Sequence, residues 1–309
     1  MATPQAICFV GVTASRSSIN QVFPRWARAL GLDRTVLTPL DLPIDTPPET
    51  YREVLLDIRD DPYCRGALVT THKVRLLAAG WDLFDELDDD AQLLGEVSCI
   101  SKRDGLLIGS AKDPTTSGRA LRAFVPAGHF ARTGGDVLCL GAGGAGLAIA
   151  VYLQARASST DRPSRLVLVS RSRGRLEACR AALKEVGVAA SVAFVRNADP
   201  TKNDELLRRL PAGSLVINAT GMGKDRPGSP ITDGATFPEE GLAWELNYRG
   251  ELQFLQQARR QADERSLCVE DGWRYFVYGW SAVIADVCGL SIDEEMLQRL
   301  SDEATAVRE

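Results

Sequence analysis

The sequence predicts an α/β fold made of two domains. With 309 residues, the chain is long for a single hydrophobic core. Short β-rich apolar runs alternate along it with amphipathic helical stretches, a pattern typical of parallel sheets covered by helices. From Asp136 onward this alternation becomes more regular, which indicates a second sheet with its own helices.

The first part of the chain contains four candidate strands with helical patterns between them. We expect strands at 6–10, 35–38, 67–70 and 97–100, and helices at 21–30, 50–59 and 74–87. The segments 98–101 and 106–110 flank Arg103-Asp104-Gly105, a turn signal that predicts a β-hairpin. Pro114, followed by two threonines and a serine, indicates a boundary and the start of a capped helix.

The second part has the more regular pattern. We expect strands at 137–140, 166–169, 192–195, 215–218 and 243–246, with helices such as 145–155 and 175–186 between them. The segment 158–164 is rich in Ser, Asp and Pro and is expected to be an exposed loop. The stretches 273–290 and 293–303 are expected to form two helices that pack back against the first domain.

The composition excludes several classes of function. Hydrophobic residues make up 45% and charged residues 25%, as in ordinary folded proteins. The formal net charge is -5 and no basic patch is evident, so we expect no nucleic-acid partner. No window reaches the roughly 18 apolar residues of a membrane span, and the first residues do not resemble a signal peptide. We therefore expect no membrane association.

Cysteine and histidine usage points to a reduced compartment and to the absence of a metal site. None of the seven cysteines forms a CxxC pair, and they are interpreted as small core residues of a cytoplasmic protein. The only histidines are His72 and His129, and neither has a cysteine or carboxylate at ligand spacing. We expect no bound metal.

A glycine-rich turn joins the first strand of the second domain to the helix that follows. It has the spacing Gly141-x-Gly143-x-x-Gly146 between an apolar strand and an Ala/Leu-rich helix. In a dinucleotide-binding turn, the first glycine permits the tight turn, the second lets the backbone approach a pyrophosphate, and the third lets the helix pack on the strand. Backbone amides of Ala142, Gly144 and Ala145 would complete the cradle. The alternative is a glycine-rich turn without a ligand.

The end of the next strand indicates which dinucleotide is used. NAD-binding domains usually carry an acidic residue there, which binds the ribose hydroxyls. This chain has Ser170-Arg171-Ser172-Arg173-Gly174-Arg175 and no acid before Glu177. Arg171 and Arg175 are predicted to hold a 2′-phosphate, which favours NADP, although NAD stays possible. The alternative is a solvated basic turn at the start of a helix.

These motifs belong to a longer series that resembles the shikimate dehydrogenases. The matching segments follow one another along the chain in the family's order. They are Val69-Thr70-Thr71-His72-Lys73, Gly95-Glu96-Val97-Ser98-Cys99, Gly109-Ser110-Ala111-Lys112-Asp113, GAGGAGLA at 141–148, SRSRGRLE at 170–177, Asn218-Ala219-Thr220-Gly221-Met222 and Glu245-Leu246-Asn247-Tyr248. The resemblance implies a Rossmann-like NADP-binding domain at 114–271 and a substrate-binding domain at 1–113 with 272–309. It also assigns Ser170, Ser172, Asn218, Ala219, Thr220 and Met222 to cofactor binding.

The resemblance implies that Lys73 and Asp113 are the catalytic pair. Hydride transfer to or from a carbon that bears a hydroxyl must be accompanied by proton transfer at the oxygen. A lysine can accept that proton or stabilise the developing alkoxide, and an aspartate can orient the lysine and the substrate hydroxyl. Alone, either residue would be interpreted as a surface charge.

The expected substrate pocket departs from the family pattern. Ser98 replaces an asparagine, Ala111-Lys112 replaces Asn-Thr, Gly279 replaces a glutamine, and the proline before the lysine is absent. The N-terminal serine motif is reduced, so the substrate-binding candidates are Ser15, Ser17, Ser18, Thr70, Ser98, Tyr248 and Gly279. Arg16, His72 and Lys112 add basic or potentially basic character, which favours an anionic substrate. Their alternative role is surface charge.

The resemblance implies an NADP-dependent alcohol dehydrogenase acting on a cyclic polyhydroxy carboxylate, either shikimate/3-dehydroshikimate or a relative. It would then belong to the shikimate pathway of aromatic amino acid biosynthesis. Because recognition of particular hydroxyls is strict, the lost polar groups leave alternatives open. These are a quinate or modified-shikimate dehydrogenase and a cofactor-binding regulatory protein without turnover. A monomer and a homodimer are both compatible with the sequence.

Overall fold

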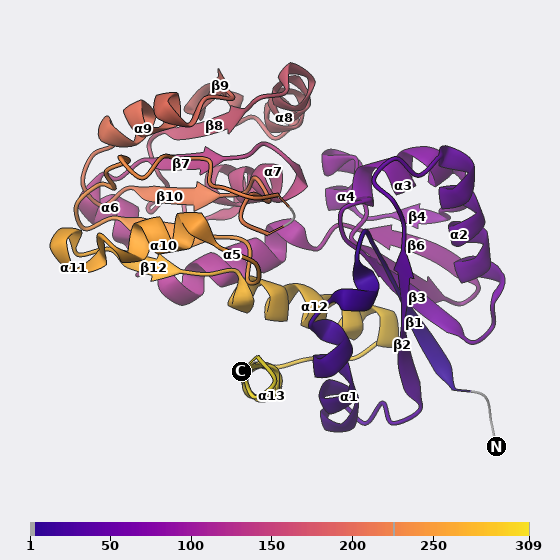
Figure 1. Ribbon diagram of the computed structural model, residues 1–309. Helices are drawn as coiled ribbons and strands as arrows, with labels where there is room; N and C mark the ends of the chain where they lie inside the picture. Colours follow the sequence, from indigo (N-terminus) through magenta and orange to yellow (C-terminus); the bar gives the residue numbers. More distant parts are fainter. Residues whose placement is uncertain (1–3, 225, 309) are drawn as a thin grey trace. The chain divides into compact units, whose positions relative to one another are not determined.

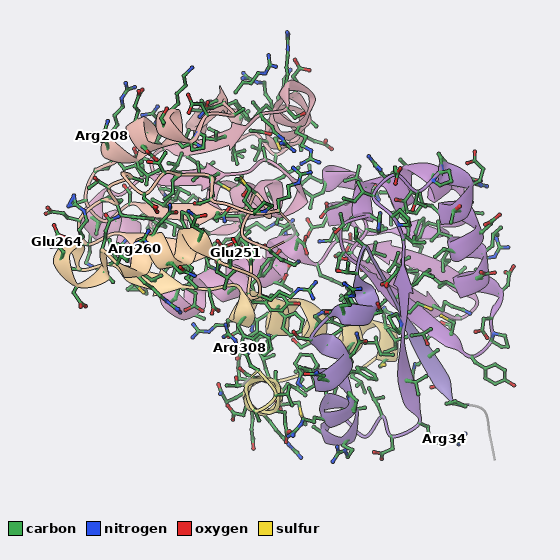
Figure 2. All side chains as sticks on the ribbon, viewed as in Figure 1. Arg34, Arg208, Glu251, Arg260, Glu264 and Arg308 are labelled. Atoms are coloured by element: carbon green, nitrogen blue, oxygen red, sulfur yellow. The ribbon has the colours of Figure 1, made fainter. Side chains whose placement is uncertain are left out.

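The computed structural model describes residues 4–224 and 226–308 and confirms the predicted two-domain α/β fold. One compact unit combines the chain up to Lys112 with the part from Val277 onward, and the other is Asp113–Phe276. Each unit contains a six-stranded sheet with helices around it (Figure 1). Charged side chains such as Arg208 and Glu264 point outward from their helices (Figure 2). No helix in the described ranges is long and apolar enough to span a membrane.

The sheet of the first unit is mixed, with the strand order β2-β1-β3-β5-β6-β4. Its strands are β1 (Gln5–Gly11), β2 (Thr35–Asp41), β3 (Cys64–Val69), β4 (Glu86–Leu87), β5 (Cys99–Arg103) and β6 (Leu106–Ser110). Strands β1, β2 and β3 are parallel, whereas β5 is antiparallel to both β3 and β6. The predicted hairpin is confirmed: Asp104 and Gly105 both have positive φ, as a tight two-residue turn requires.

Short helices connect these strands. They are η1 (Ala14–Arg16), α1 (Ile19–Ala29), α2 (Pro48–Asp60), α3 (Lys73–Gly80), η2 (Trp81–Leu83) and α4 (Asp89–Leu94). The prediction of one helix over 74–87 was wrong, because the chain leaves α3 at Gly80 and joins the sheet as β4. Asp85 fixes this change of direction: its backbone N–H donates to Leu107 O, and its carboxylate accepts from Leu107 N.

The C-terminal helices complete the first unit, as predicted. Helix α12 (Trp273–Cys288) runs from the second unit into the first, and α13 (Glu294–Thr305) follows it. The fully buried Trp26 of α1 donates its indole N–H to Leu300 O of α13 over 2.7 Å. Trp280 packs edge-on against Phe9 of β1, with ring centres 4.8 Å apart. Both contacts tie the end of the chain to its beginning.

The sheet of the second unit is entirely parallel, with the order β12-β11-β10-β7-β8-β9. Its strands are β7 (Val137–Leu140), β8 (Leu166–Ser170), β9 (Val192–Arg196), β10 (Leu215–Asn218), β11 (Leu242–Glu245) and β12 (Cys268–Glu270). The strand order reverses between β7 and β10. In open parallel sheets, ligands bind beyond the carboxyl ends of the strands at such a reversal.

Helices cover both faces of this sheet. They are α5 (Asp113–Phe124), α6 (His129–Thr133), α7 (Gly144–Val151) with the π-helical η3 (Tyr152–Arg156), α8 (Arg173–Glu185), η4 (Ala189–Ser191), α9 (Pro200–Arg208), α10 (Gln253–Arg259) and α11 (Ala262–Arg265). Leu207 of α9 and Phe254 of α10 pack on the same face, together with Leu138 and Val216. On the other face, Phe124 of α5 packs against Trp244.

The sequence analysis did not predict β12, α6, α9, α10 or α11. These elements are short, and α9 owes its position to buried polar side chains rather than to an apolar stripe. Asn203 donates to Pro230 O over 2.7 Å, and Asp204 accepts from Thr232 N over 3.0 Å. The hydrophobic periodicity of the sequence therefore gave little indication of α9.

Helix α5 packs very closely on the helix that follows β7. A Cβ at Gly118 would lie 2.2 Å from Tyr152 Cε2, so the Tyr152 ring occupies the place of a side chain. The Tyr152 hydroxyl accepts from Arg122 Nη1 over 2.7 Å, which holds the ring in position.

We predict that Gly118→Ala lowers the free energy of unfolding by about 1–3 kcal/mol, because the added methyl overpacks this contact. Gly174→Ala is the matched control, since a Cβ there meets nothing within 4 Å. It should leave stability unchanged or raise it by about 0.5–1 kcal/mol. Urea unfolding of both variants measures the difference, and equal stabilities would contradict the packing argument.

Candidate active site

The glycine turn after β7 has the geometry of a phosphate-binding turn. Gly141 has φ +117°, and a Cβ there would lie 2.4 Å from Ala219 O. A Cβ at Gly146 would lie 2.2 Å from Gly141 O, so α7 starts directly beyond the strand. At Gly143, by contrast, a Cβ would meet only Arg175 Nη1, at 3.9 Å. The backbone at Gly143 is thus open to a ligand, and the first amides of α7 lie beside it.

The segment after β8 presents two arginines next to this turn. Ser172 caps α8, since its Oγ accepts from Arg175 N over 3.3 Å, and Ser170 Oγ accepts from Ser172 N. Arg171 and Arg175 are exposed, and Arg175 extends toward Gly143. Arg173 is paired with Glu177 on the surface of α8, with 2.7 Å between Nε and Oε1. Both arginines of the predicted pair are exposed, and the binding of an anion by Arg171 and Arg175 stays a prediction.

Arg196 is a third arginine at this edge, which the sequence analysis missed. It is the last residue of β9 and the register partner of Ser170. Its Nε donates to Arg171 O over 3.4 Å, and its side chain is exposed. The sequence did offer a signal for Arg196, since it directly follows the expected strand at 192–195. The carboxyl ends of parallel strands lie at the same edge of a sheet, so Arg196 should lie near the end of the neighbouring strand.

The loop after β10 is held by its own side chains. Asn218 is fully buried, and its Oδ1 accepts from both the backbone N–H and the hydroxyl of Thr220. Its Nδ2 donates to Glu245 Oε2 over 2.7 Å. Asn218 thus shapes the loop from inside, whereas Ala219, Thr220 and Met222 are half-buried.

Glu245, at the end of β11, is the centre of this polar network and was not predicted as a site residue. Its side chain is fully buried, and its Oε1 accepts from Asn247 N at 2.8 Å and from Asn247 Nδ2 at 2.6 Å. Desolvation raises the pKa of Glu245 to about 7, and the hydrogen bonds from Asn247 and Asn218 oppose that rise. One carboxyl group therefore orders the carboxyl ends of both β10 and β11.

Tyr248 follows this network and belongs to an aromatic cluster in the second unit. Its ring centre lies 5.5 Å from that of Trp273 and 4.5 Å from that of Phe276. Trp273 and Phe276 stack on each other at 4.9 Å. The predicted substrate residue is therefore supported by a packed apolar platform.

In the first unit, Lys73 begins α3 and is half-buried. The neighbouring His72 is buried, its Nδ1 lies 2.7 Å from the Tyr51 hydroxyl, and its Nε2 lies 3.0 Å from Leu42 O. Burial lowers the pKa of His72. The expectation that His72 adds positive character for a substrate was wrong, since the ring is neutral at pH 7 and both nitrogens are engaged inside the unit.

One of the N-terminal serines, Ser15, is bonded to an acidic residue. Ser15 donates its backbone N–H to Asp41 Oδ1 over 2.9 Å and its hydroxyl to Asp41 Oδ2 over 2.5 Å. These bonds hold the pKa of Asp41 below its ordinary value, so Asp41 is ionised at neutral pH. Ser17 is buried, and Ser18 directly precedes α1. Asp41, which ends β2, was missed because the expected strand stopped at residue 38.

The residues before Asp113 are held by a second acidic residue. Ser98 Oγ accepts from Lys112 N over 2.8 Å, while Lys112 Nζ forms an ion pair with Asp286 of α12. Arg103 pairs with the same carboxylate. The predicted positive character of Lys112 is thus neutralised within the first unit. Asp113 is buried and is the first residue of α5.

Of the other predicted substrate residues, Gly279 has open space beside its backbone and Thr70 lies at the end of a strand. A Cβ at Gly279, within α12, would meet nothing within 4 Å. Thr70 directly follows β3, and its hydroxyl donates to Val10 O over 3.3 Å. Arg16 is exposed at the end of η1.

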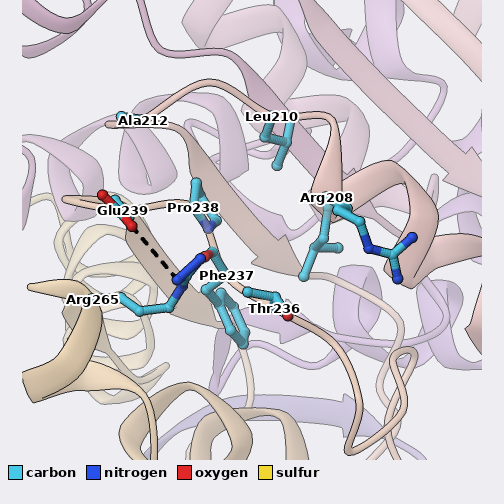
Figure 3. A pocket seen from close by; sticks show the side chains of 9 residues that line it. Arg208, Leu210, Ala212, Thr236, Phe237, Pro238, Glu239 and Arg265 are labelled. Atoms are coloured by element: carbon cyan, nitrogen blue, oxygen red, sulfur yellow. Dashed lines mark hydrogen bonds and ion pairs between the residues drawn. The ribbon is translucent and has the colours of Figure 1, made fainter.

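A surface pocket of about 250 Å³ lies elsewhere on the second unit (Figure 3). It lies before β10, β11 and β12 begin, at the edge opposite to the glycine turn, and Arg265 and Glu239 form an ion pair at its margin. Its lining residues are Leu207, Arg208, Leu210, Ala212, Thr236, Phe237, Pro238, Glu239 and Arg265. In the described part of the chain, no group of three or more His, Cys, Asp or Glu side chains is placed to hold a metal ion.

We predict that Glu245 makes stability depend on pH. Because its pKa rises from 4.5 to about 7 on folding, the folded state keeps a proton in this window that the unfolded chain has lost. The free energy of unfolding should therefore fall as pH rises from 4.5 to 7, by on the order of 3 kcal/mol from this group. Urea unfolding of the wild type and Glu245→Gln at pH 5 and pH 8 tests this. Relative to the variant, the wild type should lose stability at pH 8, and a constant difference would contradict the assignment.

Comparisons with known proteins agree with the sequence motifs and with the fold. No family model matches the chain. The shikimate dehydrogenase (NADP(+)) of Streptococcus thermophilus is 30% identical over 185 residues, which is 58% of this chain and 59% of that protein. The enzyme of the same name from Methylobacterium radiotolerans is 27% identical over 274 residues, or 88% of this chain and 86% of that protein. The chain thus spans about three fifths of the length of its streptococcal relatives.

Solved structures extend the likeness to the whole chain. Shikimate 5-dehydrogenase from Thermus thermophilus, in complex with NADP(H) and shikimate, has 25% identity and a TM-score of 0.70, and the match covers 97% of this chain and 99% of that one. Quinate dehydrogenase from Corynebacterium glutamicum, in complex with NAD, has 20% identity and a TM-score of 0.74, covering 98% and 99%. In sequence motifs and in fold, the chain is similar to the shikimate dehydrogenases.

Proposed function

We propose that this chain is an NADP-dependent alcohol dehydrogenase of the shikimate dehydrogenase type. It would transfer hydride reversibly between NADP and a secondary alcohol of a cyclic polyhydroxy carboxylate, which is shikimate/3-dehydroshikimate or a relative. The observation that carries this proposal is the open backbone at Gly143, bordered by the guanidinium of Arg175 at the reversal of a parallel sheet. Residues 114–271 would bind the cofactor, and residues 1–113 with 272–309 would bind the substrate.

The residues of the second unit fit a dinucleotide that carries an additional phosphate. Amides from Gly141 to Gly146 would hold the pyrophosphate, because the turn has no Cβ at its open position. Arg171 and Arg175, joined by Arg196, would hold the 2′-phosphate through charge-assisted hydrogen bonds. When bound, the cofactor supplies the hydride acceptor or donor. Lys73 would accept the proton of the substrate hydroxyl, and Asp113 would orient that hydroxyl.

One observation favours a modified substrate as the second candidate. Ser15 is bonded to the ionised Asp41, and a carboxylate placed beside Asp41 would be repelled. Shikimate and quinate are both carboxylates and would be repelled equally, so this observation favours a relative of shikimate that carries an amino group, which Asp41 could attract. A quinate dehydrogenase is the other alternative within the same class. A regulatory protein that binds the cofactor without turnover is the alternative from a different class.

We further propose that the protein acts in the cytoplasm, as a monomer or homodimer, in the pathway to aromatic amino acids. All seven cysteines are free thiols, which suits a reducing compartment.

We predict that the purified protein oxidises a member of a panel of shikimate, quinate and related cyclic hydroxy acids with NADP, as followed by nicotinamide absorbance. Lys73→Ala should lower turnover by about 100-fold or more while NADP affinity is unchanged, because proton transfer is lost and the cofactor residues are untouched. Turnover that survives in Lys73→Ala would contradict the assigned role. Cofactor binding without turnover of any acid in the wild type would instead favour the regulatory alternative.

We predict that Arg171→Ala and Arg196→Ala each weaken NADP binding by about tenfold and leave NAD binding unchanged, since only NADP offers the 2′-phosphate. Arg173→Ala is the matched control, because this arginine belongs to the same segment but is paired with Glu177. Fluorescence titration with both cofactors measures the ratio of affinities. A parallel loss for NAD and NADP would show that these arginines do not recognise the 2′-phosphate.

A further inference from the structure

Two cysteine side chains of the first unit are in direct contact. Cys8 lies in the middle of β1 and Cys64 begins β3, and their sulfur atoms lie 3.7 Å apart. Cys64 Sγ also lies 3.5 Å from Gly66 O, to which it can donate its proton. The two cysteines are 56 residues apart in the sequence, so the pairing of β1 with β3 brings them together. The fold therefore creates a pair of thiols that no local motif indicates.

An irregularity of the sheet lies beside this pair. The register of β3 against β1 shifts between Ala6 and Ile7, where Arg65 is an extra residue of β3. Such an insertion bends a strand and increases its local twist. Side chains alternate between the faces of a strand, so Cys8 projects from the same face as Ala6 and its register partner Cys64. The two cysteines are thus diagonal neighbours at a place where the regular pairing is interrupted.

The two thiols share one hydrogen bond and differ in exposure. Cys8 is half-buried, whereas Cys64 is 4% exposed. The hydrogen bond with Cys8 lowers the pKa of Cys64 to about 7, the charge of Lys102 acts in the same direction, and burial opposes both. The same hydrogen bond, together with burial, raises the pKa of Cys8. Near neutral pH the pair therefore contains a thiolate with a thiol beside it, as the oxidation of a dithiol requires.

The other cysteines have the properties of unreactive thiols. Burial raises the pKa of all five, which are Cys99, Cys139, Cys179, Cys268 and Cys288. For Cys99 and Cys139 the pKa reaches about 12. The thiolate is the form that reacts with oxidants, so a thiol that stays protonated reacts slowly. Reactivity is in this way concentrated at Cys8 and Cys64.

We propose that Cys8 and Cys64 form an oxidation site, at which a peroxide produces a reversible disulfide that cross-links β1 with β3 and stabilises the first unit. This inference is independent of the cofactor and the substrate of the proposed function. A disulfide places its sulfur atoms about 2.0 Å apart, so the two atoms must approach by about 1.7 Å from their distance of 3.7 Å. The interrupted register at Arg65 allows the start of β3 to make that movement.

The oxidation proceeds in two steps and needs one molecule of peroxide. The Cys64 thiolate attacks one peroxide oxygen, the O–O bond breaks, and Cys64 becomes a sulfenic acid while hydroxide leaves and takes up a proton. The sulfur of Cys8 then attacks the sulfur of Cys64. The S–S bond forms, the S–O bond breaks, and the hydroxide that leaves takes the proton of Cys8. Two thiols and one hydrogen peroxide thus give one disulfide and two waters, and a small dithiol reverses the reaction.

The thiol count of the full-length protein, reduced and then treated with hydrogen peroxide, tests this inference. The wild type should fall from seven titratable thiols to five, and peptide mapping should find Cys8 joined to Cys64. Dithiothreitol should restore all seven. Cys8→Ser should form no disulfide at Cys64, whose sulfur should be oxidised to the sulfinic acid, which dithiothreitol does not reduce. Cys268→Ser, which removes an exposed cysteine of the second unit, is the matched control and should still form the link.

Urea unfolding measures what the cross-link does to the first unit. Closing the loop between residues 8 and 64 restricts the unfolded chain. The midpoint of unfolding of the oxidised wild type should therefore rise by about 1 M urea relative to the reduced protein. Dithiothreitol should return the midpoint to its original value. Peroxide should not raise the midpoint of Cys8→Ser.

Several results would overturn the inference. Seven thiols that survive a peroxide treatment sufficient to oxidise free glutathione would do so, and so would a disulfide that joins other cysteines or that forms only in urea. An unchanged midpoint in wild type that carries the link would contradict the stabilisation of the first unit. These measurements use neither cofactor nor substrate, so each of these results leaves the proposed function intact.

Discussion

The close approach of backbone segments at the end of β7 is the constraint on which the rest of the site depends. Side chains at Gly141 and Gly146 would lie 2.4 Å from Ala219 O and 2.2 Å from Gly141 O. Because both positions are glycine, β7, the start of α7 and the loop after β10 meet without a side chain between them. The amides of α7, the arginines after β8 and at the end of β9, and the Glu245 network are consequently gathered at one edge of the sheet.

The polar side chains have different roles in the two units. In the first unit, several residues expected to meet a ligand are bonded internally: His72 to Tyr51, Ser15 to Asp41, and Lys112 to Asp286. In the second unit, buried bonds serve mainly to shape the edge, since Asn218 and Asn247 converge on Glu245 and on Met222 O. The divergence from the family motifs is thus concentrated in the first unit, and the cofactor edge keeps its geometry. This pattern is the basis for proposing that the substrate differs while the cofactor is the same as in the shikimate dehydrogenases.

Local signals predicted much of the fold and part of the site. The glycine turn, the turn at Asp104-Gly105 and the strand–helix alternation depend on residues that are close together in the sequence, and the structure confirms each of them. The helix predicted at 74–87 was longer than the observed α3, because the end of α3 depends on a hydrogen bond between Asp85 and Leu107 of another strand. Glu245 was missed for the same reason, since it acquires its role from Asn218 on another strand and from Asn247. Asp41 was missed because the expected strand ended at residue 38, and Arg196 was missed although it directly follows an expected strand. The roles of Lys73 and Asp113 remain predictions from the motifs.

The central claim is that the edge of the second sheet binds a dinucleotide with a 2′-phosphate. Calorimetric titration of the wild-type protein with NADP and with NAD, at low and at high salt, tests it most directly. The account predicts that NADP binds about tenfold or more tightly than NAD, and that this difference narrows at high salt because the arginines are exposed. Equal affinities for the two cofactors, or binding of neither, would contradict it.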